Sequence, residues 1–203
     1  YDHLSTFDWL LRGDAKSKSF RNFECKEGEL FVSGDYESAT DNLNSEVQKE
    51  IMQVILDRSL CVPADIKRLA YYSLQSRLSY EDGGVERVVQ QRNGQMMGFL
   101  TSFPLLCLVN YIAFTYVMGR DVPVRINGDD IVFRSTPERN ARWMASVEKA
   151  GLKLSVGKTL VHKRFFTLNS ALFQAGRGLP VGIPFVRSTA LFGKEDSLCS
   201  LPG

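Results

Sequence analysis

Two neighbouring aspartates, Asp129 and Asp130, lie in an Asn-Gly-Asp-Asp segment at residues 127–130. Mostly apolar, β-prone residues flank this segment, at 122–126 and at 131–133, which is typical of a tight β-hairpin turn. Adjacent carboxylates repel each other and gain nothing from packing, so a pair of them at a hairpin turn indicates a cation that neutralises them. A solvated turn is the alternative, because Asp-Gly-type turns are common on β surfaces.

A third acid follows a short apolar stretch earlier in the chain. Residues 29–35 predict a strand that ends in Asp35, and Asp41 follows where a helix is expected to begin. Divalent ions that hold phosphates take oxygen ligands from separate rigid elements. One aspartate at a strand end and a pair at a hairpin turn would therefore suit a two-metal site for phosphoryl transfer.

Three segments resemble, in order, motifs A, B and C of the viral RNA-dependent RNA polymerase palm. They are Ser-Gly-Asp-Tyr-Glu-Ser-Ala-Thr-Asp-Asn-Leu at 33–43, Gly-Gln-Met-Met-Gly-Phe-Leu-Thr-Ser at 94–102 and Gly-Asp-Asp at 128–130. The similarity is to the polymerases of ourmia-like viruses, the botourmiaviruses, and to those of narnaviruses, mitoviruses and leviviruses. It covers most of the chain, from about residue 28 to residue 173.

The resemblance implies that three aspartates and one lysine are catalytic. Asp35 and Asp129 would be ligands of two Mg²⁺ ions, which Mn²⁺ could replace, and Asp130 would be a supporting ligand beside them. Lys158, in a Gly-Lys-Thr segment that resembles motif D, could give a proton or charge to the departing pyrophosphate. Lys153 is the rival for this role, and a solvated surface lysine is the alternative.

Motifs A and B would also bind the incoming ribonucleotide. The resemblance implies that Asp41 senses the ribose 2′-hydroxyl, and the alternative is a plain helix-start acid facing the helix dipole. Gly98 matches the flexible glycine of motif B. Thr101 and Ser102 complete the predicted substrate-binding residues, and Ser102 stands where many relatives have threonine.

The helix after motif B departs from the pattern of the family. Many polymerases carry an asparagine one helical turn beyond the threonine of motif B, but Leu106 occupies that position here. Asn110 lies two turns from Ser102, about 12 Å along the helix axis. The partner of Asp41 in sugar selection is therefore open.

Composition limits the class of protein. A chain of 203 residues that is 44% apolar can fold as one compact domain. With 25 basic and 23 acidic residues, no overall field indicates a nucleic-acid partner, so RNA contacts would come from local patches. Four dispersed cysteines disfavour a zinc site and a disulfide framework. The longest apolar stretch, residues 103–118, contains polar residues and is too short to span a bilayer comfortably.

The expected elements form an α+β polymerase palm, with an antiparallel sheet and helices packed on one face. A capping box beginning at Ser45 predicts a helix whose apolar face is core, and Pro63 and Pro137 predict two further helix starts. Hairpins are expected over residues 78–89, and a strand or hairpin resembling motif E over 165–173.

We expect three regions along the chain. Residues 1–27 would be an approach segment, the possible end of the fingers, and we expect it to be solvated rather than bound to RNA. Residues 28–175 would be the palm catalytic domain. Residues 176–203 would be an irregular tail toward a thumb. The chain begins without methionine, which predicts a fragment lacking fingers and thumb that extends no primer alone. Host cytoplasm is the expected compartment, with the mitochondrion suggested by the family relationship.

Three functions compete. The first is RNA synthesis from nucleoside triphosphates on an RNA template, at the 3′ end of an RNA primer or nascent strand, for viral genome replication. The second is reverse transcription, which would favour an aromatic gate at the position of Thr40. The third is a non-catalytic RNA-binding sheet, for which Tyr36 is the obvious stacking aromatic near the site. We favour the first, because position 40 is not aromatic and an RNA-binding sheet would need no paired acids.

Overall fold

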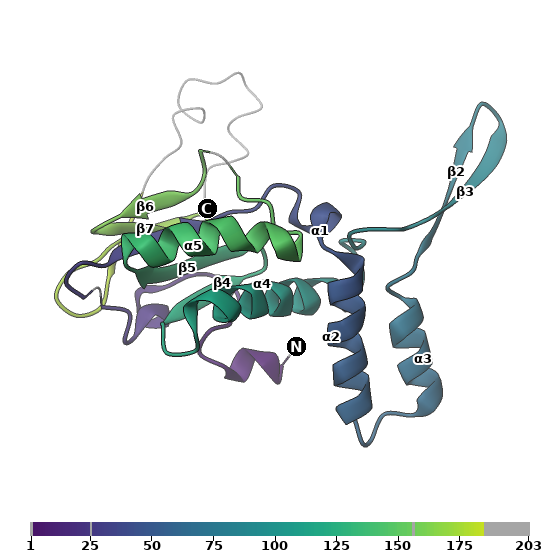
Figure 1. Cartoon of the computed structure of the whole chain (residues 1–203), viewed down its shortest axis with the longest axis horizontal. Helices are drawn as coiled ribbons and strands as arrows, with labels where there is room; N and C mark the ends of the chain where they lie inside the picture. The colour runs from purple at the N-terminus through teal and green to yellow at the C-terminus, as the bar shows by residue number, and fades with distance from the viewer. Residues whose placement is uncertain (1, 25, 156, 185–203) are drawn as a thin grey trace.

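The computed structural model describes residues 2–24, 26–155 and 157–184. Its main sheet contains four strands in the order β4 (Val124–Asn127), β5 (Asp130–Ser135), β1 (Leu30–Gly34) and β6 (Leu160–His162). Neighbouring strands of this sheet are antiparallel. Figure 1 shows two helices lying along the sheet. The predicted α+β fold with an antiparallel sheet is therefore confirmed.

Helices α4 (Ser102–Met118) and α5 (Pro137–Val147) pack on one face of the main sheet (Figure 1). Phe133 of β5 faces them, with its ring centroid 5.0 Å from that of Phe114 in α4 and 4.8 Å from that of Trp143 in α5. All three rings are fully buried. Because large aromatic side chains dominate the burial of apolar area, this contact fixes both helices against the sheet.

A second sheet covers the opposite face. It contains β7 (Phe165–Leu168), β8 (Ala171–Gln174) and β9 (Val181–Ile183), all antiparallel. Side chains alternate between faces along a strand, so Phe31 and Val132 point away from the helices and into this second core. The ring centroid of Phe31 lies 4.7 Å from that of Phe166 in β7. The main sheet is thus covered on both faces, by helices on one side and by strands on the other.

The N-terminal segment contributes to both cores, with Leu10 in the core under the helices and Phe20 and Phe23 in the second core. The sequence predicts a solvated approach over residues 1–27, and this is wrong for several of its apolar residues, although Phe7 is 45% exposed. Phe20 and Phe23 are 1% and 4% exposed, and Leu10 forms a parallel bridge with Ile126 at the edge of the main sheet. Two short 3-10 helices, η1 (Leu4–Thr6) and η2 (Ser17–Phe20), shape the segment.

The C-terminal region differs from the expected irregular tail. Residues 181–183 form β9, in which Gly182 pairs with Phe173 of β8. The hairpin expected over residues 165–173 is confirmed as β7 and β8, joined by Asn169 and Ser170 in left-handed conformations. Residues 185–203 of the predicted tail lie outside the described residues.

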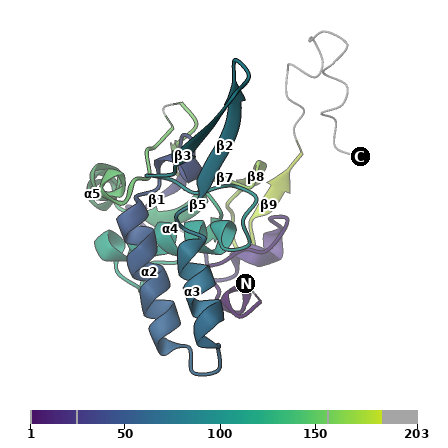
Figure 2. The same ribbon diagram turned by 90° about the vertical axis from the view of Figure 1, so that its right-hand side faces the viewer.

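An arm, residues 45–90, stands beside the main sheet (Figures 1 and 2). It consists of α2 (Ser45–Arg58), α3 (Ala64–Tyr72) and the hairpin of β2 (Arg77–Asp82) and β3 (Val85–Gln90). The hairpin and the helix start after Pro63 are as predicted. However, α3, β2 and β3 contain no buried residue.

The apolar face of α2 is buried only in part. The sequence predicts a core face along the whole helix, which is wrong for its C-terminal half, because Val54 and Ile55 are 51% and 41% exposed. The two buried residues of α2 are Gln48 and Met52. The helix therefore contacts the body of the protein mainly through its first half.

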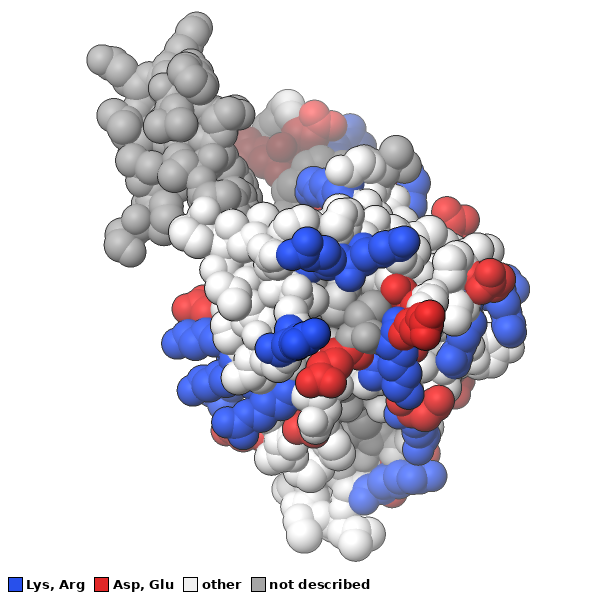
Figure 3. Space-filling model, turned by 90° about the vertical axis from the view of Figure 1, so that its left-hand side faces the viewer, with Lys and Arg blue, Asp and Glu red and all other residues white. Residues whose placement is uncertain are grey.

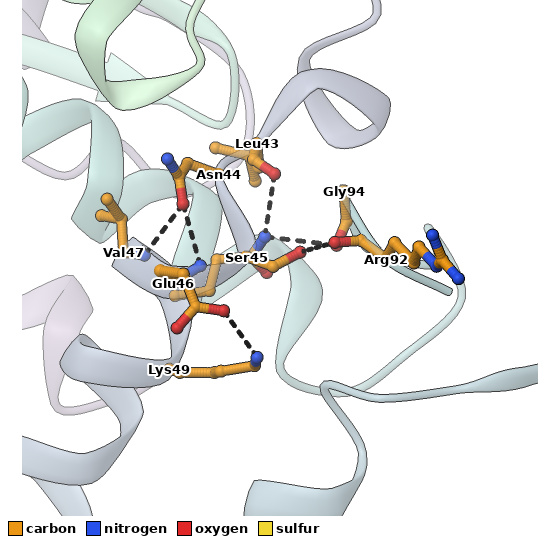
Figure 4. Close-up of polar contacts among 9 residues, drawn as sticks. Leu43, Asn44, Ser45, Glu46, Val47, Lys49, Arg92 and Gly94 are labelled. Atoms are coloured by element: carbon orange, nitrogen blue, oxygen red, sulfur yellow. Dashed lines mark hydrogen bonds and ion pairs between the residues drawn. The ribbon is translucent and has the colours of Figure 1, made fainter. Parts of the chain in front are cut away.

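The N-cap of α2 lies one residue before the predicted N-cap. Asn44, rather than Ser45, is the N-cap, and its Oδ1 accepts hydrogen bonds from the backbone N–H groups of Glu46 and Val47 at 2.8 and 3.3 Å (Figure 4). The Ser45 hydroxyl instead donates to the carbonyl of Arg92, 3.0 Å away. The cap thus also connects α2 to the segment that follows the arm.

Two predictions from composition can be compared with the described residues. None of the helices in the described ranges is long and apolar enough to cross a membrane. Cys61 and Cys107 are free thiols, exposed and buried respectively. Cys25 and Cys199 lie outside the described residues.

Candidate active site

The β4–β5 hairpin places Asp129 at its turn. Asn127 pairs with Asp130, so Gly128 and Asp129 form a two-residue turn. Gly128 has φ +64°, a left-handed conformation that glycine adopts without strain. Glycine at the first turn position is typical of hairpins whose turn matches the twist of the strands. Local turn chemistry therefore fixes Asp129 at the end of the sheet.

The register of β1 against β5 brings Asp35 to the same end. Gly34, the last residue of β1, lies opposite Ile131 near the start of β5. Asp35 follows directly, next to the turn that carries Asp129. We call this end of the main sheet, with Asp35, Asp129 and Asp130, the acid end. The structure thus brings the three predicted acids together from two separate segments.

A cavity of about 500 Å³ opens at the acid end. Its volume falls within the range of roughly 300–1,000 Å³ that is usual for ligand sites. Five of the predicted site residues line it, namely Asp35, Asp41, Ser102, Asp129 and Lys158. Gly98, Thr101 and Asp130 are not among the residues that line it. The cavity therefore combines residues from motifs A, B, C and D.

Burial and mutual repulsion raise the pKa of the two hairpin acids. Burial is the main cause of the raised pKa of Asp129, and the nearby charge of Asp35 adds to it. For Asp130, burial followed by the charges of Asp129 and Asp35 raises the pKa to about 6. A hydrogen bond from the backbone N–H of Asn169 to Asp130 Oδ2, at 3.0 Å, opposes this shift. A cation at the acid end would relieve this repulsion.

Lys158 supplies positive charge to the acid end. Its Nζ lies 3.0 Å from Asp35 Oδ2, and this contact is the main reason that the pKa of Lys158 is raised. The rival lysine is placed elsewhere, because Lys153 Nζ lies 3.0 Å from Glu37 Oε2. Of the two candidates, Lys158 lines the cavity at the acid end and Lys153 does not.

The acid end offers metal-binding atoms that are engaged in other contacts. Within residues 2–24, 26–155 and 157–184, no three or more His, Cys, Asp or Glu side chains are arranged to hold a metal ion. Asp35 contacts the ammonium of Lys158, and Asp130 accepts the hydrogen bond from Asn169. Clustered carboxylate oxygens on separate elements are nevertheless the ligand type of Mg²⁺ and Mn²⁺. The residues present therefore fit a divalent cation by their chemistry.

The motif B loop is bonded to the short helix α1 (Ala39–Asn42), which carries Asp41. The N–H of Gln95 donates to the carbonyl of Thr40 at 2.8 Å, and the N–H of Gly94 donates to the carbonyl of Leu43 at 2.9 Å. A Cβ at position 94 would lie 2.6 Å from the carbonyl oxygens of Thr40 and Asp41. Only glycine permits this close approach.

Two buried glutamines that the sequence reasoning did not identify support this loop. Gln48 of α2 donates through Nε2 to the carbonyl of Gly94 at 3.2 Å. Gln95 donates to the carbonyl of Ser102 at 2.7 Å. The Ser102 hydroxyl itself donates to the carbonyl of Met96. Ser102 therefore fixes the loop in this structure, and Asp41 is left exposed on the cavity wall.

A further contact that the sequence reasoning did not identify joins motifs A and C through α4. Asn110 in α4 is fully buried and bonds to Tyr36 and to the carbonyl of Gly128. Its carboxamide is therefore committed to these partners and does not supply the partner of Asp41. Tyr36 is only 3% exposed, so it does not display a ring on which an RNA base could stack. The sequence contains a signal for this contact, because Asn110 is a lone carboxamide in an apolar helix.

The surface charge agrees with the near-neutral composition. On the face shown in Figure 3, Lys and Arg side chains are interspersed with Asp and Glu side chains. No extended basic field covers this face. Any contact with a nucleic-acid backbone there would use separate basic side chains rather than one continuous patch.

Curated viral polymerases are similar to this chain in sequence. No family model matches it. The RNA-dependent RNA polymerase of Ourmia melon virus (isolate Melon/Iran/VE9) is 34% identical over 182 residues, which cover 80% of this chain and 21% of that protein. The RNA-directed RNA polymerase of Saccharomyces 23S RNA narnavirus is 27% identical over 159 residues, which cover 70% of this chain and 16% of that protein. The chain thus spans about a fifth or less of the length of these relatives.

Solved polymerase structures are similar to it in fold. The RNA-dependent RNA polymerase of a human picorbirnavirus has a TM-score of 0.62 at 15% identity, over 83% of this chain and 35% of that chain. Apo telomerase from Candida tropicalis has a TM-score of 0.61 at 13% identity, over 82% of this chain and 35% of that chain. At such low identity these likenesses concern the fold alone. By sequence and by fold together, the chain resembles the palm of viral RNA-dependent RNA polymerases.

Proposed function

We propose that this chain is the catalytic palm of a viral RNA-dependent RNA polymerase that replicates an RNA genome. The observation that carries the proposal is the cavity at the acid end, where Asp35, Asp129 and Lys158 from three different segments converge. The substrates would be nucleoside triphosphates, an RNA template and the 3′ end of a primer or nascent RNA. Similarity to the two viral polymerases supports this substrate class.

Asp35 and Asp129 would hold the divalent cations, with Asp130 beside them. When bound, two Mg²⁺ or Mn²⁺ ions supply charge that stabilises the attacking and leaving oxygens of nucleotidyl transfer. To become a ligand, Asp35 would exchange its contact with Lys158 for the cation. Lys158, exposed and flexible, would then be free to meet the departing pyrophosphate and donate a proton to it.

Asp41 and the motif B loop would bind the ribose. Asp41 lines the cavity and is exposed, so its carboxylate can accept a hydrogen bond from a 2′-hydroxyl. The bonds from Gly94 and Gln95 to α1 hold the turn that carries Asp41. Movement of the loop through Gly98, which is exposed, would adjust this contact.

The regional assignment is also a proposal. Residues 28–175 would be the palm, residues 1–27 the possible end of the fingers, and residues 176–203 the connection toward a thumb. Because positioning of substrates can account for roughly 7–11 kcal/mol of a reaction barrier, the palm alone would extend no primer. Host cytoplasm is the compartment we propose for the complete protein, with the mitochondrion as the alternative.

Primer extension by the complete polymerase tests the function. Asp129→Ala should lower the rate by at least about 10²–10³, by analogy with the loss of one preorganised charge stabiliser, while the protein stays folded. Near-normal synthesis by a folded Asp129→Ala enzyme would contradict the proposal. The telomerase-like fold makes reverse transcription the second candidate. The same assay with deoxyribonucleotides distinguishes it, because our proposal requires a preference for ribonucleotides.

A further inference from the structure

One buried side chain connects the two segments that carry Asp35 and Asp129. The hydroxyl of Tyr36 donates a hydrogen bond to Asn110 Oδ1 at 2.9 Å. Asn110 Nδ2 in turn donates to the carbonyl of Gly128 at 3.2 Å. Asn110 therefore bridges motif A and motif C from the middle of α4.

The two partners of Asn110 are direct chain neighbours of the acids. Tyr36 follows Asp35, and Gly128 precedes Asp129. A shift in either hydrogen bond would therefore move the backbone that carries an acid. Since Asn110 is 0% exposed and Tyr36 is 3% exposed, water does not compete for these bonds.

The helix that carries Asn110 is a rigid support. Leu106, one turn earlier in α4, and Val109, directly before Asn110, are buried in the core under the helices. Phe114, one turn further, packs its ring against Phe133 of β5. Side chains held by packing of this kind keep a functional group within the small tolerance that a cation site requires.

The residue type matches this bridging role. A carboxamide is both a donor and an acceptor, so it can serve the Tyr36 hydroxyl and the Gly128 carbonyl at once. Leucine would serve neither, and aspartate would lack the donor for Gly128. A buried amide in an apolar helix lowers stability unless its bonds are made, so its presence needs these partners.

We propose that Asn110 is a positioning residue that sets the separation of Asp35 and Asp129 through Tyr36 and Gly128. The proposal rests on the proposed function, because it assigns the bridge a role in shaping the site for a divalent cation. Losing the bridge should leave both acids in place along the chain but allow them to move independently. Cation affinity and the chemical step should then fall together.

The test uses the complete polymerase, three single variants and the double variant Asn110→Leu/Tyr36→Phe. Asn110→Leu removes both bonds while keeping the number and branching of the side-chain heavy atoms, and Tyr36→Phe removes one bond and keeps the ring. Asn140→Leu is the matched control, because Asn140 is 4% exposed in α5 and donates to the carbonyl of Ser135 at 3.4 Å. Ser135 lies opposite Leu30, at the far end of the sheet from the acids.

Mn²⁺ affinity, measured by the electron paramagnetic resonance of free Mn²⁺, is the readout that does not depend on turnover. We expect Asn110→Leu to weaken Mn²⁺ binding and to lower kcat by about 10- to 100-fold, as for other residues that orient metal ligands. Tyr36→Phe should have a smaller effect, and the double variant should match Asn110→Leu. Asn140→Leu should lower the melting temperature without changing Mn²⁺ affinity.

Two results would overturn the proposal. One is a folded Asn110→Leu enzyme with the Mn²⁺ affinity of the wild type. The other, which decides the matter if Asn110→Leu does not fold, is unchanged Mn²⁺ affinity in Tyr36→Phe. Failure of the proposed function is a separate result, because it would be seen as a wild-type polymerase that binds Mn²⁺ and makes no RNA.

Discussion

The acid end of the sheet and the arm both contain apolar side chains, but these side chains have opposite surroundings in the structure. Strand β5 beside the acids is buried almost throughout, between helices on one side and strands on the other. In the arm, Leu69 of α3 and Val88 of β3 are each 61% exposed. Apolar periodicity therefore predicts which face of an element is apolar, and the rest of the chain decides whether that face is covered.

The difference has a consequence for function. Acids that must keep a fixed separation are attached to the most tightly packed strands, where interiors resist small displacements. The arm connects to this region through the first half of α2, where Gln48 reaches the motif B loop. The rest of the arm exposes apolar side chains, among them Ile66, Leu69 and Tyr72 of α3.

The largest expected effect compares the two regions directly. Phe133→Ala should lower the free energy of unfolding by about 3–5 kcal/mol, because it removes a ring packed between α4 and α5. Leu69→Ala, at an exposed position of the arm, should change it by no more than about 0.5 kcal/mol. Urea unfolding followed by tryptophan fluorescence measures both. Equal losses of unfolding free energy in the two variants would show that the arm is packed as tightly as the main sheet.

The next effect concerns Lys158 at the acid end. Arginine keeps the charge but is a poor proton donor, so Lys158→Arg should slow the single-turnover rate by about 10- to 100-fold with little change in nucleotide binding. Lys153→Arg is the matched control, because Lys153 contacts Glu37 instead of Asp35. If both variants kept the wild-type rate, neither lysine would be the donor.

A smaller effect concerns sugar choice at the cavity wall. If Asp41 accepts a hydrogen bond from the 2′-hydroxyl, Asp41→Ala should narrow the preference for ribonucleotides by about tenfold, the value of one bond to a charged group. Competing incorporation of ribonucleotides and deoxyribonucleotides by the complete polymerase measures this. Equal losses for both sugars would leave Asp41 only a structural role at the start of α1.

The smallest expected effect concerns how the stability of the folded protein depends on pH. Because the pKa of Asp130 is raised to about 6 in the folded protein, ionising it there is unfavourable, so its contribution to stability is lost as pH rises from about 4 to above 6. Asp130→Asn should therefore raise the metal-free melting temperature at pH 8 more than at pH 4. Asp57→Asn, in the arm, is the control for loss of a carboxylate. An equal rise in the melting temperature of Asp130→Asn at both pH values would show that its surroundings do not destabilise the ionised form of Asp130.

Much of the acid end could be predicted because its signals are local. The Gly128-Asp129 turn follows from four consecutive residues, and Asp35 follows from the strand that it ends. The cap of α2 was misplaced by one residue because Asn44 and Ser45 are both good caps, and only the bond from Ser45 to Arg92 decides between them.

Contacts between distant segments were not predictable. Tyr36 and Asn110 are 74 positions apart, so no local pattern indicates their bond. The exposure of Val54 and the burial of Phe20 depend likewise on which segments meet in space. The sequence does show an unusual carboxamide, Asn110, in an apolar helix. Only the fold shows which groups it bonds to.

The most direct test of the central claim is where Mn²⁺ binds in crystals of the complete polymerase, located by anomalous scattering. The account predicts a Mn²⁺ ion bound by the carboxylates of Asp35 and Asp129, with Lys158 moved away from Asp35. Mn²⁺ bound elsewhere, with the contact between Lys158 and Asp35 intact at saturating concentrations of the ion, would contradict it.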